Sequence, residues 1–108
     1  KVDTGKIILK NYFNLDGTEL YDEIREKTAK AMIQLIRVFL KKYPNLKSRK
    51  QFGKPTFNRR RNSSDSLLNI NKSIKSQFDL IRICDNENFP LFFNLRKKRY
   101  ILKVYKWK

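Results

Sequence analysis

The feature that most constrains the fold is an amphipathic segment between residues 18 and 43. Apolar residues recur in it at the spacing of one helix face: Leu20, Ile24, Ala31, Leu35 and Phe39. Either Asp16, with Glu19 three residues on, or Thr18 caps the segment at its start. Pro44 ends it, because proline does not continue a helix. We therefore predict one long helix that ends at about Tyr43 and buries this stripe on a sheet.

Apolar runs elsewhere in the chain predict strands. Residues 6–13, 78–84 and 100–107 are rich in Ile, Leu and aromatic side chains. Residues 88–95 are open to two interpretations: their alternating apolar residues favour a strand, and their proline favours the first turn of a short helix. Together these segments predict an α+β fold with a small antiparallel sheet, one long helix and a short second helix. Their order is close to a ferredoxin-like βαββαβ layout.

The charge of the chain points to a polyanionic partner. The 108 residues carry 26 Lys and Arg against 10 Asp and Glu, a net charge of +16. A hydrophobic content of 40% is too high for a disordered basic tail, so we predict a single folded domain over residues 1–108. Residues 27–64 and 88–108 contain no acid. We predict that these stretches contact nucleic acid, and that residues 44–77 form a long extended basic loop.

Eleven of the cations in the acid-free stretches are the first candidates for RNA contacts. They are Lys47, Arg49, Lys50, Lys54, Arg59, Arg60, Arg61, Arg96, Lys97, Lys98 and Arg99. Three adjacent arginines at 59–61 repel one another, which phosphate would relieve, although a solvated run is the plainer interpretation. Phe52 and Phe57 lie among these cations, where a pure linker has no use for them. Tyr105 and Trp107 alternate with lysine and would either stack on bases or pack against protein.

The sequence offers little for catalysis or for a metal centre. It has no His, and Cys84 is its one cysteine, so neither a Cys/His metal cluster nor an intrachain disulfide is expected. We expect no cofactor, no small-molecule substrate and no membrane span, since the apolar runs are far shorter than a bilayer requires. A His-free ribonuclease toxin stays an alternative. Its acid–base groups would come from Asp65, Asp79, Asp85, Glu87 and Tyr105.

Two short motifs resemble the family of small-subunit ribosomal protein ten. Ile70-Asn71-Lys72 is similar to the family's Val-Asn-Lys element, and Gln77-Phe78-Asp79 to its Gln-Phe/Tyr-Glu element, which begins a strand. Residues 57–61 stand where the family has a Thr-Arg/Lys-Lys run. Residues 68–69 are Leu-Asn where it has Pro-His. The opening and closing strands of the family would correspond to residues 6–10 and 100–107.

The resemblance implies a non-enzymatic structural constituent of the small ribosomal subunit, acting in translation. Its partners would be small-subunit ribosomal RNA and neighbouring ribosomal proteins of the subunit head. The resemblance adds four residues to the expected RNA contacts: Asn69, Asn71, Lys72 and Lys75. A bias toward Lys, Asn, Ile, Phe and Tyr is expected from AT-rich coding, so we expect the ribosome to be mitochondrial. A cytoplasmic ribosome of an AT-rich microbe is the alternative.

Overall fold

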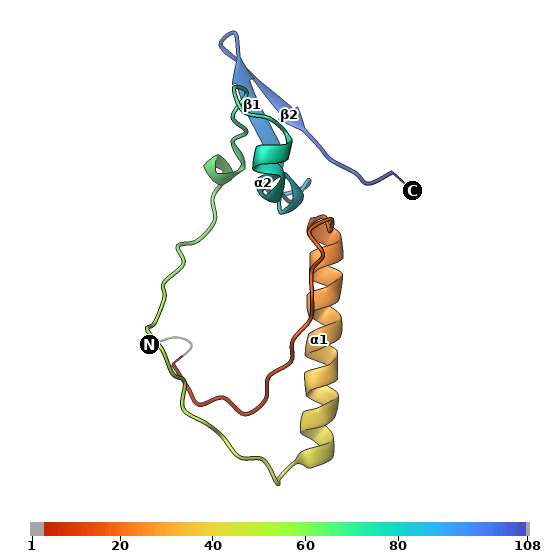
Figure 1. Cartoon of the computed structure of the whole chain (residues 1–108), viewed down its shortest axis with the longest axis vertical. Coiled ribbons are helices and arrows are strands. Elements are labelled where there is room, and N and C mark those ends of the chain that lie inside the picture. The colour runs from red at the N-terminus through yellow and green to blue at the C-terminus, as the bar shows by residue number, and fades with distance from the viewer. Residues whose placement is uncertain (1–3, 108) are drawn as a thin grey trace. The chain divides into compact units, whose positions relative to one another are not determined.

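The computed structural model describes residues 4–107, which form an α+β fold with two α-helices and a two-stranded antiparallel sheet (Figure 1). The elements are α1 (Tyr21–Lys42), α2 (Phe78–Arg82), β1 (Leu91–Leu95) and β2 (Lys98–Leu102), with 3₁₀ turns at Ser63–Ser66 and Lys75–Gln77. The predicted α+β class, with a long helix, a short helix and a small antiparallel sheet, is therefore confirmed. The ferredoxin-like arrangement is not.

The described residues divide into two compact units. The helix unit comprises residues 4–14 and 26–58, and the hairpin unit comprises residues 15–25 and 59–107. Each is described by itself below. The prediction of a single domain over 1–108 stays a prediction.

The long predicted helix is present as α1, and its start is stabilised by carboxylates. The Glu23 side chain accepts the backbone N–H of Leu20 at 3.2 Å, and the Glu19 side chain accepts that of Asp16 at 2.9 Å. The Glu23 bond satisfies an N–H group that the helix start otherwise leaves unpaired, and the Glu19 bond holds the turn that leads into the helix. Acids in the first turn and Lys41 and Lys42 in the last also suit the helix dipole.

The part of the helix stripe that lies in the helix unit packs against irregular chain and not against a sheet. Ala31 is buried and Leu35 and Phe39 are half-buried, and all three belong to the helix unit, which has no sheet in its described residues. The N-terminal chain runs beside α1 instead (Figure 1), where the Asn11 side chain donates to the Ala31 carbonyl at 3.1 Å. The predicted strand at residues 6–13 is therefore wrong. Only Ile7 makes a bridge there, and a bridge without further register is no strand.

The predicted strand at residues 78–84 is also wrong, because most of it forms α2. The apolar residues that the fold buries, Ile81 and Cys84, lie three apart, and half-buried Leu80 lies four before Cys84. This is helical spacing, whereas a strand would bury every second residue. The 3₁₀ turn at Lys75–Gln77 leads directly into the helix. The apolar residues of 78–84 thus fit the period of a helix as well as that of a strand, and packing selected the helix.

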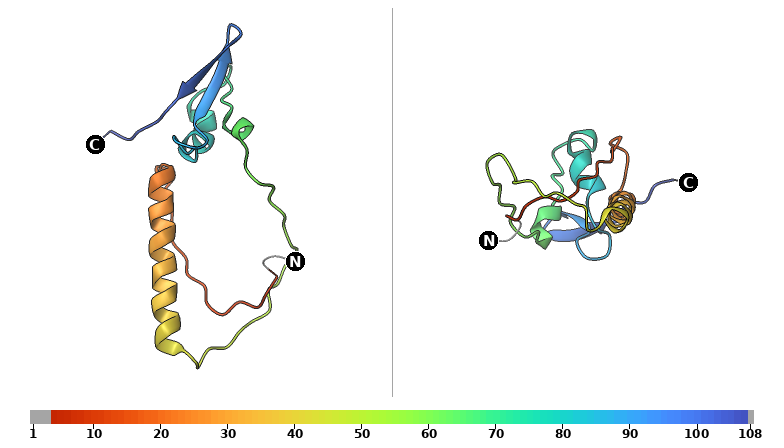
Figure 2. Two further views of the ribbon diagram at one scale, coloured as in Figure 1. Left: turned by 180° about the vertical axis from the view of Figure 1, so that it is seen from behind. Right: turned by 90° about the horizontal axis from the view of Figure 1, so that it is seen from below.

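The sheet is one hairpin, β1–β2. β1 begins directly after Pro90, so of the two interpretations of residues 88–95 the strand is present, at Leu91–Leu95. In the hairpin, Leu91 pairs with Leu102 at one end of the strands and Leu95 with Lys98 at the other. The predicted strand at 100–107 is half right, because β2 begins earlier and ends at Leu102. Figure 2 shows the hairpin from two further sides.

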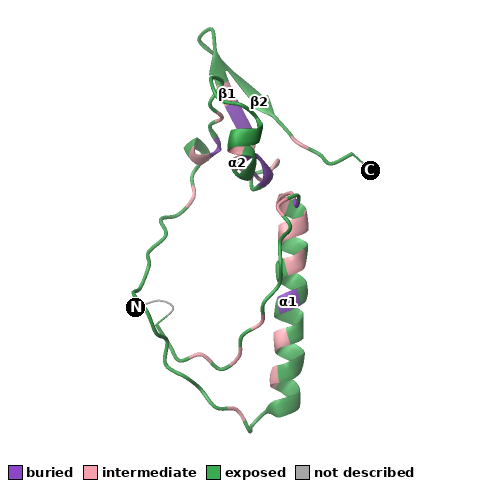
Figure 3. Cartoon of the chain, viewed as in Figure 1, coloured by how far each residue is buried: buried purple, intermediate pink, exposed green. Residues whose placement is uncertain are grey.

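A small core lies under one face of the hairpin unit. Ile81, Cys84 and Leu91 are buried, and Leu68, Leu80 and Val104 pack against them. Figure 3 shows the buried residues of this unit on β1 and beside α2. Ser66 is also fully buried, and its hydroxyl donates to the Phe89 carbonyl at 2.8 Å. The core therefore joins the end of the basic stretch to the hairpin.

Candidate nucleic-acid interface

The predicted RNA contacts at Lys47, Arg49, Lys50 and Lys54 lie in the helix unit on irregular, exposed chain. Arg49 exchanges both backbone hydrogen bonds with Ile7 at 2.7 Å, which fixes the chain while its side chain stays in solvent. Phe52 and Phe57 lie in the same stretch, each 94% exposed. Such exposure is unfavourable for an aromatic ring in water, and in a cationic segment it is typical of surfaces that stack on bases.

The three arginines at 59–61 have three different environments. Arg59 forms an ion pair with Asp65 through two hydrogen bonds, one of 2.9 Å. Arg60 is exposed. Arg61 is half-buried and donates to the Ser66 hydroxyl at 3.1 Å. The three arginines therefore differ in their protein partners: Arg59, with a side chain 64% exposed, pairs with Asp65, Arg61 bonds Ser66, and Arg60 is exposed. Their predicted contact with RNA stays a prediction.

The Arg59–Asp65 ion pair shifts the pKa values of both side chains. The hydrogen bond from Arg59, followed by that from the Asn62 backbone, lowers the pKa of Asp65 from 3.8 to about 2. The same pair raises the pKa of Arg59. Asp65 is also the reach-back residue of a capping box, since Asn62 accepts the Ser64 N–H at 3.0 Å and donates its own N–H to Asp65 at 2.9 Å.

Residues 69–77 form a closed loop and not an extended one. The Gln77 side chain accepts the N–H of Asn69 at 3.0 Å and donates to the carbonyls of Asn69 at 2.8 Å and Lys72 at 3.2 Å. The Asn69 side chain in turn accepts the N–H of Asn71 at 2.9 Å. Gln77 and Asn69 therefore shape the loop, and exposed Lys72 and Lys75 are the cations it presents. An extended basic loop over 44–77 is not confirmed.

The cations at 96–99 form the tip of the hairpin. Arg96 and Lys97 are the two loop residues, and both have positive φ values, 50° and 65°. Lys98 and Arg99 begin β2, and all four side chains are exposed. The Arg99 guanidinium lies 4.5 Å from the centre of the Phe92 ring, a cation–π contact. The tip is thus a cluster of cations held on paired strands.

Sequence reasoning missed a buried ion pair in the hairpin unit. Arg82 donates to the Glu19 carboxylate and to the Glu19 carbonyl, both at 2.9 Å, and the two side chains are 10% and 3% exposed. Arg82 also pairs with exposed Asp79 at 3.2 Å. A lone arginine in an apolar run is the signal that could have predicted a buried partner, since an unpaired buried charge is very unfavourable.

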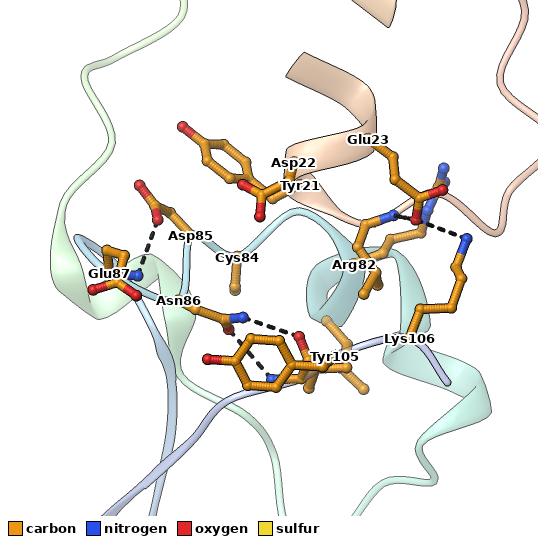
Figure 4. A pocket seen from close by; sticks show the side chains of 13 residues that line it. Tyr21, Asp22, Glu23, Arg82, Cys84, Asp85, Asn86, Glu87, Tyr105 and Lys106 are labelled. Atoms are coloured by element: carbon orange, nitrogen blue, oxygen red, sulfur yellow. Dashed lines mark hydrogen bonds and ion pairs between the residues drawn. The ribbon is translucent and has the colours of Figure 1, made fainter. Parts of the chain in front are cut away.

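A cavity of about 410 Å³ in the hairpin unit is acidic (Figure 4). The carboxylates that line it are Asp22, Glu23, Asp85 and Glu87. The hydrogen bond from Lys106, at 2.7 Å, lowers the pKa of Glu23, and the Glu87 backbone N–H lowers the pKa of Asp85. The four carboxylates outnumber the two cations of the lining, Arg82 and Lys106, so this cavity is a poor site for phosphate.

In the part of the chain that the structure describes, no cluster of three or more His, Cys, Asp or Glu residues could hold a metal ion. No helix among residues 4–107 is long and apolar enough to cross a membrane. No protein-family model, curated protein or solved structure matches the chain.

Proposed function

We propose that this protein binds RNA without catalysis, neutralising phosphates with two exposed cationic surfaces. The first, the cationic segment, is residues 47–58 of the helix unit. The second, the hairpin tip, is residues 96–99 of the hairpin unit. Each supplies exposed lysines and arginines, and neither contains an acid. A surplus of cations over local acids is the usual footprint of a polyanion site.

One observation at the hairpin tip carries the proposal. Arg96 and Lys97 both adopt the left-handed backbone conformation that a two-residue loop requires. Asn-Gly is preferred there, because a residue with an ordinary side chain is disfavoured in this conformation by roughly 1–2 kcal/mol. Strained backbone is retained where function requires it. We infer that two cations occupy these positions because they bind a ligand and not because they stabilise the hairpin.

The cationic segment adds a second kind of contact. Phe52 and Phe57 are almost fully exposed and are separated by Lys54. An aromatic face can stack on an unpaired base while a neighbouring cation binds its phosphate. This arrangement favours RNA as the ligand over an acidic protein, because an acidic protein offers negative charge but no bases to stack on the rings.

The finer assignment is to the RNA of a small ribosomal subunit, in a mitochondrion. It rests on the sequence resemblance at residues 70–79 and on the coding bias. The structure differs from the family pattern in that residues 78–82 form a helix where the family begins a strand, and residues 6–10, which would match the opening strand, hold only a bridge at Ile7. Co-migration of the native protein with small subunits in a sucrose gradient would support this assignment. Migration only with free protein would contradict it and leave RNA binding itself untouched.

The test of RNA binding is the double substitution Arg96→Asn, Lys97→Gly. Asn-Gly should keep or strengthen the hairpin, because it fits the left-handed loop. The loss of two cations should weaken RNA binding and reduce the slope of log affinity against log salt by about 1–2 units. Affinity would be measured by fluorescence anisotropy with an RNA containing a stem and a loop. Unchanged affinity at every salt concentration would contradict the role of the tip.

A matched control removes the same charge elsewhere. Lys41 and Lys42 lie in the last turn of α1 and are exposed, and both can be changed to Gln. We expect this control to affect binding much less than the change at the tip. Equal losses would mean that only net charge matters. Reproducible cleavage of the RNA at one site by wild-type protein, removed by substitution of Asp79 or Tyr105, would favour the ribonuclease alternative.

A further inference from the structure

Helix α1 carries a second apolar stripe, and every member of it is at least half exposed. Its members are Met32 (57% exposed), Ile33 (50%), Ile36 (56%), Leu40 (68%) and, just after the helix, Tyr43 (67%). Their spacing of three and four residues places them on one face. We call this set the outer stripe. It lies beside the stripe of Ala31, Leu35 and Phe39, and the rings of Phe39 and Tyr43 are in contact, with centroids 5.7 Å apart.

The outer stripe has the character of a docking surface. Apolar residues scattered singly on a surface are normal, but a contiguous patch of long side chains marks an interaction site. The alternation of three- and four-residue steps from Ile33 through Ile36 and Leu40 to Tyr43 is the seam by which helices pack on helices. An amphipathic helix would therefore fit this face lengthwise.

The charges along the border of the stripe indicate what charge a partner helix would carry. Lys30, Arg37 and Lys41 recur at helical spacing beside it, and all three are exposed. Lys30 has a partner, Glu26, on its own helix at 3.4 Å, and no acid occurs between residues 27 and 64. A second copy of this chain would bring the same cations to the border, where like charges repel. RNA offers no comparable apolar face.

We propose that the outer stripe binds an amphipathic helix of another protein, whose apolar seam is bordered by Glu and Asp. The partner's apolar residues cover Ile33, Ile36 and Leu40, and its acids pair with Arg37 and Lys41. This inference concerns a protein partner and is independent of RNA binding.

The test uses designed peptides of about 15 residues, long enough to form a helix on the surface. The first has a leucine seam flanked by Glu, the second has Lys in place of Glu, and the third has the composition of the first in scrambled order. Binding to the full chain would be measured by fluorescence anisotropy. The first peptide should bind at least tenfold more tightly than the scrambled one, which carries the same charge, and than the lysine one.

Two variants test the surface itself. The first is a triple variant that replaces apolar side chains of the stripe by glutamine: Met32→Gln, Ile36→Gln, Leu40→Gln. The three positions are exposed and glutamine is a good helix former, so the helical circular dichroism should persist. The affinity for the first peptide should fall at least tenfold. Arg37→Glu, Lys41→Glu should reverse the preference between the first two peptides. Lys42→Gln, a surface change outside the border, should leave the affinity within about twofold if the border charges are specific.

Four results would overturn the proposal. Equal binding of the seamed and scrambled acidic peptides would show charge attraction alone. A concentration-dependent dimer, abolished by the triple Gln variant in sedimentation equilibrium, would assign the stripe to a second copy. Protection of the stripe from photo-oxidation of Met32 by RNA alone would assign it to RNA. Failure of all three peptides to bind a monomeric, helical protein would mean that the stripe is covered by the chain itself or by no helix of this kind.

Discussion

Residues 44–58 and 59–77 form one basic stretch in the sequence, but the structure treats its two halves differently. In 44–58, of the helix unit, the side chains of the cations are exposed and both phenylalanines project into solvent. In 59–77, of the hairpin unit, a capping box, an ion pair and the Gln77 side chain close the backbone into short turns. The second half is also joined to the core through Ser66 and Leu68.

The difference shows that basic composition alone does not distinguish a binding segment from a structural one. What separates the halves is the presence of local acceptors. Asp65, Asn62 and Gln77 supply oxygens for nearby donors in the second half, and the first half has no acid to do the same. Where acceptors are absent, cations stay free for an external anion. The predictions that follow, from the largest expected effect to the smallest, test this contrast.

The largest effect should come from removing a charge that the hairpin unit has buried. Glu19→Ala leaves the Arg82 guanidinium buried with its main partner gone, which should lower the free energy of unfolding by about 3–5 kcal/mol. Glu26→Ala breaks an exposed pair in the helix unit and should change it by less than about 0.5 kcal/mol. Urea denaturation followed by circular dichroism gives both values. Similar values for the two variants would contradict the contrast.

A smaller loss of stability should follow truncation of the apolar residue that anchors the second half. Leu68 packs against the core, and its backbone N–H donates to the Phe92 carbonyl at 2.8 Å, so Leu68→Ala should cost about 1–3 kcal/mol. Phe57→Ala, in the exposed half, should be neutral within about half a kcal/mol despite removing more atoms. A clear loss of stability in Phe57→Ala would show that this ring is packed in solution.

Limited proteolysis should separate the halves by rate. Trypsin should cut first after Lys47, Arg49, Lys50, Arg59 or Arg60, because exposed chain with few internal hydrogen bonds adapts most readily to a protease. Cleavage after Lys72 or Lys75 should be slower, since the loop at 69–77 is closed by side-chain bonds. RNA should protect the first half. The cuts would be mapped by mass spectrometry. First cuts after residue 72 or 75 would mean that the second half, and not the first, is the more open part of the chain.

The three arginines should differ in RNA affinity. Arg60→Ala should weaken binding and lower the salt slope by about one unit, because this exposed side chain can reach phosphate. Arg59→Ala should have a smaller effect, since its guanidinium is already paired with Asp65. Arg61→Ala should act mainly on stability, through the lost bond to Ser66. Affinity would be measured by anisotropy at several salt concentrations. Three equal losses would mean that all three arginines contact phosphate in the same way.

The smallest effect is a pH dependence confined to acid. The pKa of Asp65 is lowered to about 2 in the folded protein, from an ordinary value of 3.8, so this carboxylate stabilises the fold above about pH 4. That contribution is lost as the pH falls toward 2. NMR titration of the Asp65 carboxyl carbon should show the low pKa in the wild type. In Arg59→Ala it should rise toward the ordinary value, and an unchanged pKa would mean that the pair does not persist in solution.

The sequence by itself determined α1 and the excess of cations. The helix was predictable because its apolar period extends over five turns and Pro44 ends it. The cationic character was predictable because charge is a sum over residues and needs no fold. The cations at 47, 50, 54 and 60 could therefore be proposed as contacts from the absence of acids around them in the chain.

Only the tertiary structure decided the rest. Residues 78–84 satisfy both a helical and an alternating pattern, and burial of Ile81 and Cys84 against Leu91 selected the helix. The tip at 96–97 lacks the Asn-Gly signal of a hairpin loop, so the pairing of β1 with β2 was needed to reveal it. Whether a given cation is free or structural depends on which oxygen lies near it. That is a property of packing between residues distant in sequence, as Arg82 and Glu19 show.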